Sequence, residues 1–168
     1  RYSSSAASDV YKRQPILVGA NELFKKQLKG LAISLDSISS SQYEYEILQL
    51  YIWGKSKIWV GSQSGGSMPA TLFGTPTMWL DYHPSGHFQP PNNIDIFLPR
   101  KVFCRKLNRF LSWEESVSDE HSYGQSESLI YALKYGYEIH PADQSIVKEA
   151  YQYLMLSLIH ISEPTRLS

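Results

Sequence analysis

The stretch Lys57–Asp81 constrains the fold more than any other part of the chain, and it reads KIWVGSQSGGSMPATLFGTPTMWLD. Its two short apolar runs, Ile58–Gly61 and Thr77–Leu80, are typical of buried parallel strands. A loop of glycine and serine follows the first run, and Gly74 and Pro76 end the apolar segment before the second. The pattern predicts one βαβ unit with its tight turn at the carboxyl end of the first strand.

Pro69 locates the start of the short helix in this unit. Because proline lacks an N–H and has a fixed φ, it fits only the first helical turn, which places the helix cap at Gly66 or Ser67. Backbone N–H groups at such a start favour phosphate. We therefore predict a phosphate-binding loop made of Ser62, Gln63, Ser64, Gly65, Gly66 and Ser67. An ordinary βα turn, in which glycine and serine are also common, is the alternative.

Two well-known phosphate-binding motifs are absent from the sequence of this loop. No Gly-Lys-Ser/Thr follows it, and Gly61, Gly65 and Gly66 do not have the spacing GxGxxG. The loop therefore predicts neither a Walker A nucleotidase nor a dinucleotide-binding enzyme.

Both ends of the chain resemble translated adapters of a transposon-based sequencing kit. Asp9–Gln14 can be encoded by GAT GTG TAT AAG AGA CAG, and the reverse complement of that string translates as Leu156–Ile161. We therefore expect residues 1–14 and 156–168 to be adapter-derived and exclude them from fold prediction, which leaves residues 15–155 as a native domain fragment. The alternative is a genuine polar N-terminus and an apolar C-terminal helix.

Charge and cysteine content limit the functional classes. Residues 15–155 carry 12 Lys and Arg (16 minus four in the ends) and 14 Asp and Glu (16 minus two), so their net charge is −2. Without a basic face we expect no nucleic-acid partner. Cys104 is the only cysteine, which excludes an internal disulfide and favours a reducing, cytoplasmic compartment. No apolar run approaches the ~20 residues of a membrane span, so we expect a soluble globular domain.

Predicted strands and helices alternate along the rest of the chain. Such alternation is typical of α/β proteins, and it predicts a Rossmann-like, doubly wound parallel sheet with helices on both faces. The predicted elements outside the βαβ unit are strands at Pro15–Ala20, Leu31–Leu35 and Asn93–Pro99, and helices at Glu22–Lys29, Ser41–Trp53 (ended by Gly54), Ser126–Lys134 (ended by Gly136) and from His140 through Leu154. Leu129, Ile130 and Leu133 are expected to be buried.

The long irregular segment Asp81–Asn93 leaves the carboxyl end of the second strand, where ligands of open α/β sheets bind. Asp81, Tyr82 and His83 are therefore candidates for ligand contacts, with solvated loop residues as the alternative. His83 and His87 have H-x3-H spacing, but Pro84 and Gly86 between them prevent the regular helix that would bring both to one metal. We predict no metal site.

Two polar patterns lie after Asn93 in the chain. Ser112 and Glu115 have the spacing of a capping box, in which the two residues cap one helix start reciprocally. A basic cluster precedes them and could pair with phosphate oxygens, although a solvated face is the simpler interpretation. Its members are Arg100, Lys101, Arg105 and Lys106.

The βαβ unit resembles the donor-binding C-terminal half of GT-B glycosyltransferases. The match consists of G-[ST]-x-S-G at Gly61–Gly65, followed by Ala70, Gly74 and Pro76. The chain is most similar to a glycosyltransferase family encoded with bacterial surface-polysaccharide genes, and more distantly to heptosyltransferases. Asn93–Lys101 with Arg109–Glu115 resembles the same family's run D-I-x-[IL]-P-K … R-x-L-[ST]-F-x-E. The likeness covers about Ile16–Met155 and is sharp only in these two places.

The resemblance implies a transferase that binds a nucleotide-diphosphate sugar and transfers the sugar to a saccharide or lipid-linked acceptor in surface polysaccharide synthesis. It implies no cofactor and no metal, because the predicted loop would itself stabilise the leaving diphosphate. Asp81 and His83 become possible contacts to the donor sugar or base. The catalytic base of GT-B enzymes usually comes from the N-terminal domain, so the catalytic residues stay unknown. A peripheral position of the full protein at the inner membrane is compatible with this role.

Gln63 and the helix after the loop depart from related patterns. Gln63 stands where heptosyltransferases often have Asp, and the Glu pair of many retaining enzymes is not evident, which favours an inverting enzyme. Nucleotide-sugar 2-epimerases share the S-G-G loop, but acidic residues usually follow it there, whereas Met68–Thr71 follows it here. A non-catalytic sugar-phosphate-binding domain is the third interpretation.

Overall fold

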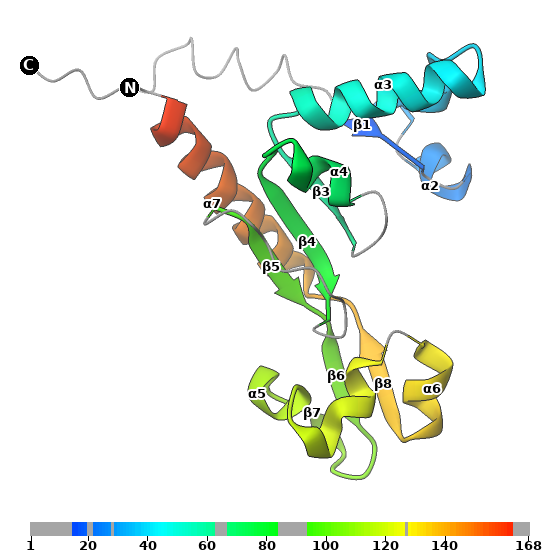
Figure 1. Ribbon diagram of the computed structural model, residues 1–168. Coiled ribbons are helices and arrows are strands. Elements are labelled where there is room, and N and C mark those ends of the chain that lie inside the picture. The colour runs from blue at the N-terminus through cyan, green and yellow to red at the C-terminus, as the bar shows by residue number, and fades with distance from the viewer. Residues whose placement is uncertain are drawn as a thin grey trace, which may run out of the picture. The chain divides into compact units, whose positions relative to one another are not determined.

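The computed structural model describes residues 15–19, 22–27, 29–62, 67–83, 94–126 and 128–162. The chain divides into two compact units, Arg1–Trp53 and Gly54–Ser168. Within the described residues it is a mixed α/β protein with parallel strands (Figure 1).

The described residues of the first unit form two short parallel strands, two α-helices and a 3-10 helix. Strand β1 (Ile16–Leu17) pairs with β2 (Ile33–Ser34), and α2 (Glu22–Gln27) lies between them in sequence. The 3-10 helix η1 (Leu35–Ser37) and α3 (Gln42–Lys55) follow. The predicted elements are confirmed in kind, but the strands are shorter than expected and α3 continues through Gly54 to Lys55.

The second unit contains the predicted βαβ unit, which is confirmed. Strand β3 (Trp59–Ser62) leads through α4 (Ser67–Leu72) to β4 (Thr77–Tyr82), which pairs in parallel with β5 (Ile96–Pro99). The strand order is β3-β4-β5. All three carboxyl ends therefore point to one edge of this sheet.

Helix α7 (Gln144–Ser162) covers one face of the parallel sheet and passes behind β4 and β5 in Figure 1. Leu154 of α7 packs with Met78 of β4 and Leu98 of β5, and each of the three is at most 7% exposed. Because side chains alternate along a strand, Thr77 and Trp79 point to the opposite face. The helix continues past Met155 to Ser162.

A second, antiparallel sheet follows β5, and the sequence did not predict it. Its strands are β6 (Lys101–Cys104), β7 (Arg109–Phe110) and β8 (Tyr137–His140), in the order β7-β6-β8. With it go three short helices, α5 (Trp113–Ser116), η2 (Asp119–Gln125) and α6 (Leu129–Lys134). The expectation of a parallel sheet therefore holds in part: β3, β4 and β5 are parallel, whereas β6, β7 and β8 are antiparallel.

Helix α6 corrects a second expectation. Leu129, Ile130 and Leu133 are 57%, 81% and 47% exposed, whereas Ala132 is fully buried against the antiparallel sheet. A helix of six residues buries one narrow stripe, and here the smallest apolar residue lies on it. The predicted end of the helix is confirmed by Gly136, whose φ of 86° suits glycine. No helix in the described ranges is long and apolar enough to cross a membrane.

Candidate functional site

The carboxyl edge of the parallel sheet brings the two predicted ligand-binding segments together. Ser62, the last residue of β3, pairs with Leu80 of β4, and the chain leaves both strands in the same direction. The glycine–serine segment that follows Ser62 and the segment Asp81–His83 therefore start at one edge. This adjacency is the outcome expected for a βαβ unit with a ligand site at its strand ends.

The predicted phosphate-binding loop lies only partly within the described residues. Ser62 is exposed at the end of β3, and Ser67 is the first residue of α4. Pro69 is the third residue of α4, which confirms its predicted place in the first turn. The remaining predicted residues, Gln63, Ser64, Gly65 and Gly66, lie outside the described ranges.

Gly61 has a packing role that the motif alone did not reveal. A Cβ at this position would lie 2.6 Å from Cζ2 and Cη2 of Trp59, two residues earlier on the same face of β3. That approach is too close for any side chain, so glycine is required to let the indole lie along the strand.

Asp81 has a structural partner. Its Oδ1 accepts a hydrogen bond of 3.1 Å from the N–H of Ala142, just before α7. Its φ is 53°, and the pairing of β4 with β5 is irregular between Trp79 and Tyr82. A left-handed backbone at a non-glycine residue is costly, and it persists here because it turns the carboxylate toward the start of α7. His83 follows β4 directly and is half-buried.

A row of aromatic rings crosses the sheet toward this edge. Trp79, which is 2% exposed, contacts Trp59 edge to face at 5.7 Å and stacks on Phe97 at 5.8 Å between ring centroids. Phe97 contacts Tyr82 at 4.8 Å, and Tyr82 lies 6.4 Å from Trp113, at an interplanar angle of 38°. Nothing in their spacing marks them as one row.

The predicted basic cluster makes contacts inside the protein instead of forming a free cationic patch. Lys101 Nζ lies 3.1 Å from both carboxylate oxygens of Asp143 and 4.7 Å from the centroid of the Phe110 ring. Arg105 Nε donates to Glu138 Oε1 at 2.7 Å. These acceptors already balance the two cations, which weakens the interpretation of the cluster as a diphosphate site.

Arg100, the first member of that cluster, begins a chain of buried hydrogen bonds. Arg100 Nε donates to Gln125 Oε1 at 3.2 Å, and Gln125 Nε2 donates to Ser116 Oγ at 2.8 Å. The Ser116 hydroxyl donates in turn to the carbonyl of Trp113 at 2.8 Å. All three polar residues are at most 7% exposed. The start of α5 is thereby fixed to the junction between β5 and β6.

The predicted capping box at the start of α5 is confirmed. Glu115 N donates to Ser112 Oγ at 3.2 Å, and Ser112 N donates to Glu115 Oε2 at 2.9 Å. Arg109 adds two further hydrogen bonds, of 2.6 and 2.8 Å, to the carboxylate of Glu115. The hydrogen bonds from Arg109 and from the Ser112 backbone lower the pKa of Glu115 from 4.5 to about 2.

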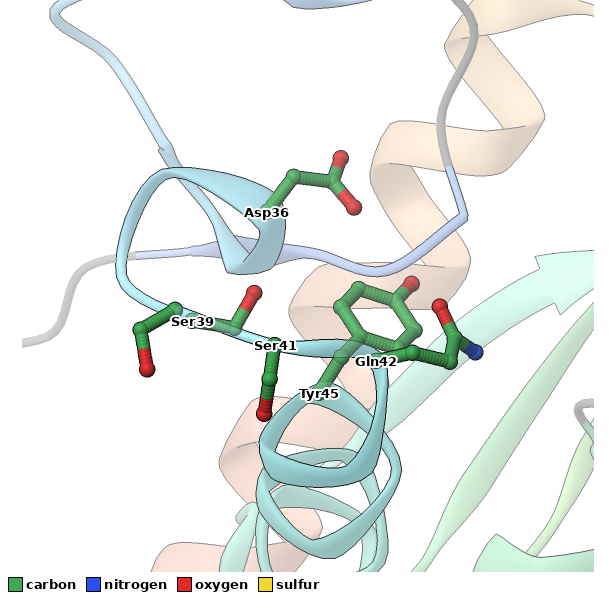
Figure 2. Close-up of a pocket in the computed structure, with 6 residues that line it drawn as sticks. Asp36, Ser39, Ser41, Gln42 and Tyr45 are labelled. Atoms are coloured by element: carbon green, nitrogen blue, oxygen red, sulfur yellow. The ribbon is translucent and has the colours of Figure 1, made fainter.

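A depression on the described surface lies elsewhere, in the first unit. It has a volume of about 250 Å³ and surrounds the start of α3, as Figure 2 shows. Its lining residues are Asp36, Ser39, Ser40, Ser41, Gln42 and Tyr45. Glu44 already accepts from Ser40 N at 2.6 Å and donates its own N–H to Ser41 Oγ at 3.1 Å, so the helix start is capped. Asp36 is paired with Lys25 at 2.5 Å. A capped helix start beside a carboxylate offers little to an anion.

Among the described residues no three His, Cys, Asp or Glu side chains lie close enough together to hold a metal ion. His87, which the H-x3-H spacing includes, lies outside the described ranges.

No family model, curated protein or solved structure matches this chain. The likeness to glycosyltransferases therefore rests on the sequence motifs alone.

Proposed function

We propose that this chain is the donor-binding part of a glycosyltransferase, which holds a nucleoside-diphosphate sugar at the carboxyl edge of β3 and β4. The observation that carries the proposal is the parallel register that ends with Ser62 beside Leu80. Because of this register, the glycine–serine loop and the segment Asp81–His83 begin at the same edge of the sheet, which is where open α/β sheets bind nucleotides.

In this function the residues at the edge would stabilise the leaving group of the transfer reaction. When an acceptor hydroxyl attacks the anomeric carbon of the sugar, the bond to the diphosphate oxygen breaks and negative charge grows on the diphosphate. Backbone N–H groups and hydroxyls of residues 62–67 would supply fixed donors to that charge, which is effective because they need no reorganisation. Asp81 holds the start of α7 through Ala142, so we assign it a positioning role and leave His83 as the contact to the donor.

Calorimetric titration tests this proposal. The 168-residue chain is titrated with UDP, GDP, CDP, ADP and inorganic pyrophosphate. We expect saturable binding of pyrophosphate and tighter binding of one nucleoside diphosphate. The double variant Ser64→Ala/Gly65→Val should weaken both at least about tenfold, since it removes a hydroxyl donor and crowds the backbone donors.

Ser145→Ala, an exposed serine on α7, is the matched control and should bind like the parent chain. The proposal is overturned if the folded parent chain binds none of the five ligands, or if the double variant binds them unchanged. Binding of pyrophosphate alone would favour a general phosphate-binding module over a transferase.

A further inference from the structure

We infer that Tyr82 and Trp113 form a stacking platform for the nucleobase of the bound ligand. This inference deepens the proposed function and rests on it for the identity of the ligand as a nucleotide. It assigns a base-binding role to Tyr82 of β4, already a candidate for ligand contacts, and to Trp113 of α5, for which the sequence predicted no role.

The first support is that Trp113 is both exposed and firmly held. Its side chain is 39% exposed, although indole is among the most costly side chains to leave in water. Its position is nevertheless fixed, because it is the first residue of α5 and directly follows the reciprocal cap of Ser112 and Glu115. Its carbonyl also accepts the hydroxyl of Ser116. A ring that is needed only for packing would not require this degree of control.

The second support is that Arg100 links the backbones of both residues. The backbone N–H of Arg100 donates to the carbonyl of Tyr82 at 3.1 Å. From the same residue, the side-chain path through Gln125 and Ser116 reaches the carbonyl of Trp113. Burying a guanidinium, an amide and a hydroxyl is expensive, and a fully connected network of this kind specifies geometry more than it adds stability. Here the geometry that it specifies is the placement of two aromatic residues.

The third support is the location of the pair. Tyr82 ends β4 and lies two residues beyond Leu80, which is the pairing partner of Ser62. Phosphate groups at the loop after β3 would therefore leave the base of the same nucleotide within reach of the pair. Bases stack on aromatic rings through their π faces, whatever the base, so this contact supplies affinity without requiring matched donors.

The experiment separates the platform from the phosphate loop by using probes that contain one part of the ligand each. Uridine, guanosine, cytidine and adenosine report on the platform, inorganic pyrophosphate reports on the loop, and the nucleoside diphosphates report on both. Each probe is titrated into the parent chain and into Trp113→Ala, Trp113→Leu, Trp113→Phe and the control Tyr131→Ala. Tyr131 is a partly exposed ring on α6, 42% accessible, away from β4.

We expect one nucleoside to bind the parent chain. Trp113→Ala and Trp113→Leu should weaken that nucleoside and its diphosphate by about ten- to a hundredfold, the usual loss for one stacking ring, and leave pyrophosphate unchanged. Trp113→Leu keeps a large apolar side chain without an aromatic ring, so it replaces the alanine variant in the test if that variant folds poorly. Trp113→Phe should recover most of the affinity, and Tyr131→Ala should bind like the parent chain.

Failures of the two proposals have different signatures. The platform is overturned if both non-aromatic variants bind the nucleoside as the parent does, or if nucleoside diphosphates bind no tighter than pyrophosphate and no nucleoside binds. Nucleoside binding that depends on Trp113, without pyrophosphate binding, would keep the platform and overturn the phosphate loop. Absence of all binding would overturn both.

Discussion

The two sheets of the second unit are held together by different interactions. The parallel sheet packs Met78 and Leu98 against Leu154 of α7 in an apolar cluster. The antiparallel sheet has a smaller apolar cluster around Val102, and it adds the buried path from Arg100 to Trp113. The apolar cluster supplies stability that depends little on direction, whereas the hydrogen-bonded path depends on geometry.

This difference assigns different tasks to the two regions. In the proposed function, the parallel sheet is the base from which the residues after Ser62 and after Tyr82 leave. The antiparallel region places α5, and with it Trp113, beside that base. We therefore expect substitutions in the parallel sheet to lower stability most. Substitutions in the antiparallel region should lower ligand affinity as well as stability.

The largest expected effect is on the parallel sheet. Leu154→Ala removes a side chain that is 1% exposed and leaves a cavity in the cluster with Met78 and Leu98, so the free energy of unfolding should fall by about 2–5 kcal/mol. Leu156→Ala, two residues later on the same helix and 58% exposed, is the control and should cost about 1 kcal/mol or less. Urea unfolding followed by circular dichroism measures both. Equal losses for the two variants would contradict the packing of α7.

An intermediate effect is expected in the antiparallel region. Gln125→Ala removes the acceptor of Arg100 Nε and the donor to Ser116 Oγ, both in buried surroundings, and should lower the free energy of unfolding by about 1–3 kcal/mol. Gln152→Ala, at an exposed position on α7, should change it by about 0.5 kcal/mol or less.

Ligand binding to Gln125→Ala and Leu154→Ala sharpens the comparison between the two regions. Gln125→Ala should also weaken the nucleoside that depends on Trp113, because the carbonyl of Trp113 loses part of its support. Leu154→Ala should leave the affinity for that nucleoside unchanged, when both variants are measured under conditions in which they are folded. Nucleoside affinity unchanged in Gln125→Ala would show that the polar path serves stability alone.

The smallest effect concerns pH. Glu115 has a pKa of about 2 in the folded protein against 4.5 for the unperturbed group, so its contribution to stability is present above pH 4.5 and is lost as pH falls toward 2. The parent chain should therefore lose its stability advantage over Glu115→Gln across that window, as measured by unfolding at each pH.

Arg109→Gln tests the assigned cause of this pH dependence. Arg109→Gln should remove much of the stability that Glu115 contributes above pH 4.5, because Arg109 is the largest contributor to the lowered pKa of Glu115. The advantage of the parent chain over Glu115→Gln would then be smaller in the Arg109→Gln background. A constant difference between parent and Glu115→Gln from pH 5 to pH 2 would contradict the ion pair as its source.

Much of the parallel region, and two helix ends of the antiparallel region, were predictable from local patterns. The apolar runs around the glycine–serine loop identified β3 and β4, and Pro69 identified the first turn of α4. The spacing of Ser112 and Glu115 identified the cap of α5, and Gly136 identified the end of α6. Each of these signals acts within a few residues, so the sequence carries it without knowledge of distant contacts.

The antiparallel region was not predictable in the same way. β7 has two residues, and its pairing with β6 is decided by long-range contacts. The exposure of Ile130 contradicts its hydrophobicity, because α6 has room to bury only the stripe that contains Ala132. The role of Asp81 was likewise hidden, since its partner Ala142 lies 61 residues away.

The sequence by itself determined the βαβ unit, the cap of α5 and the end of α6, because these follow from periodicity, glycine, proline and capping residues. The tertiary structure alone decided that Tyr82 and Trp113 meet and that Arg100 supports both. The physical reason is range: a cap or a strand is specified by neighbours in the chain, whereas a pair of rings and a buried hydrogen-bonded path exist only after distant segments have packed.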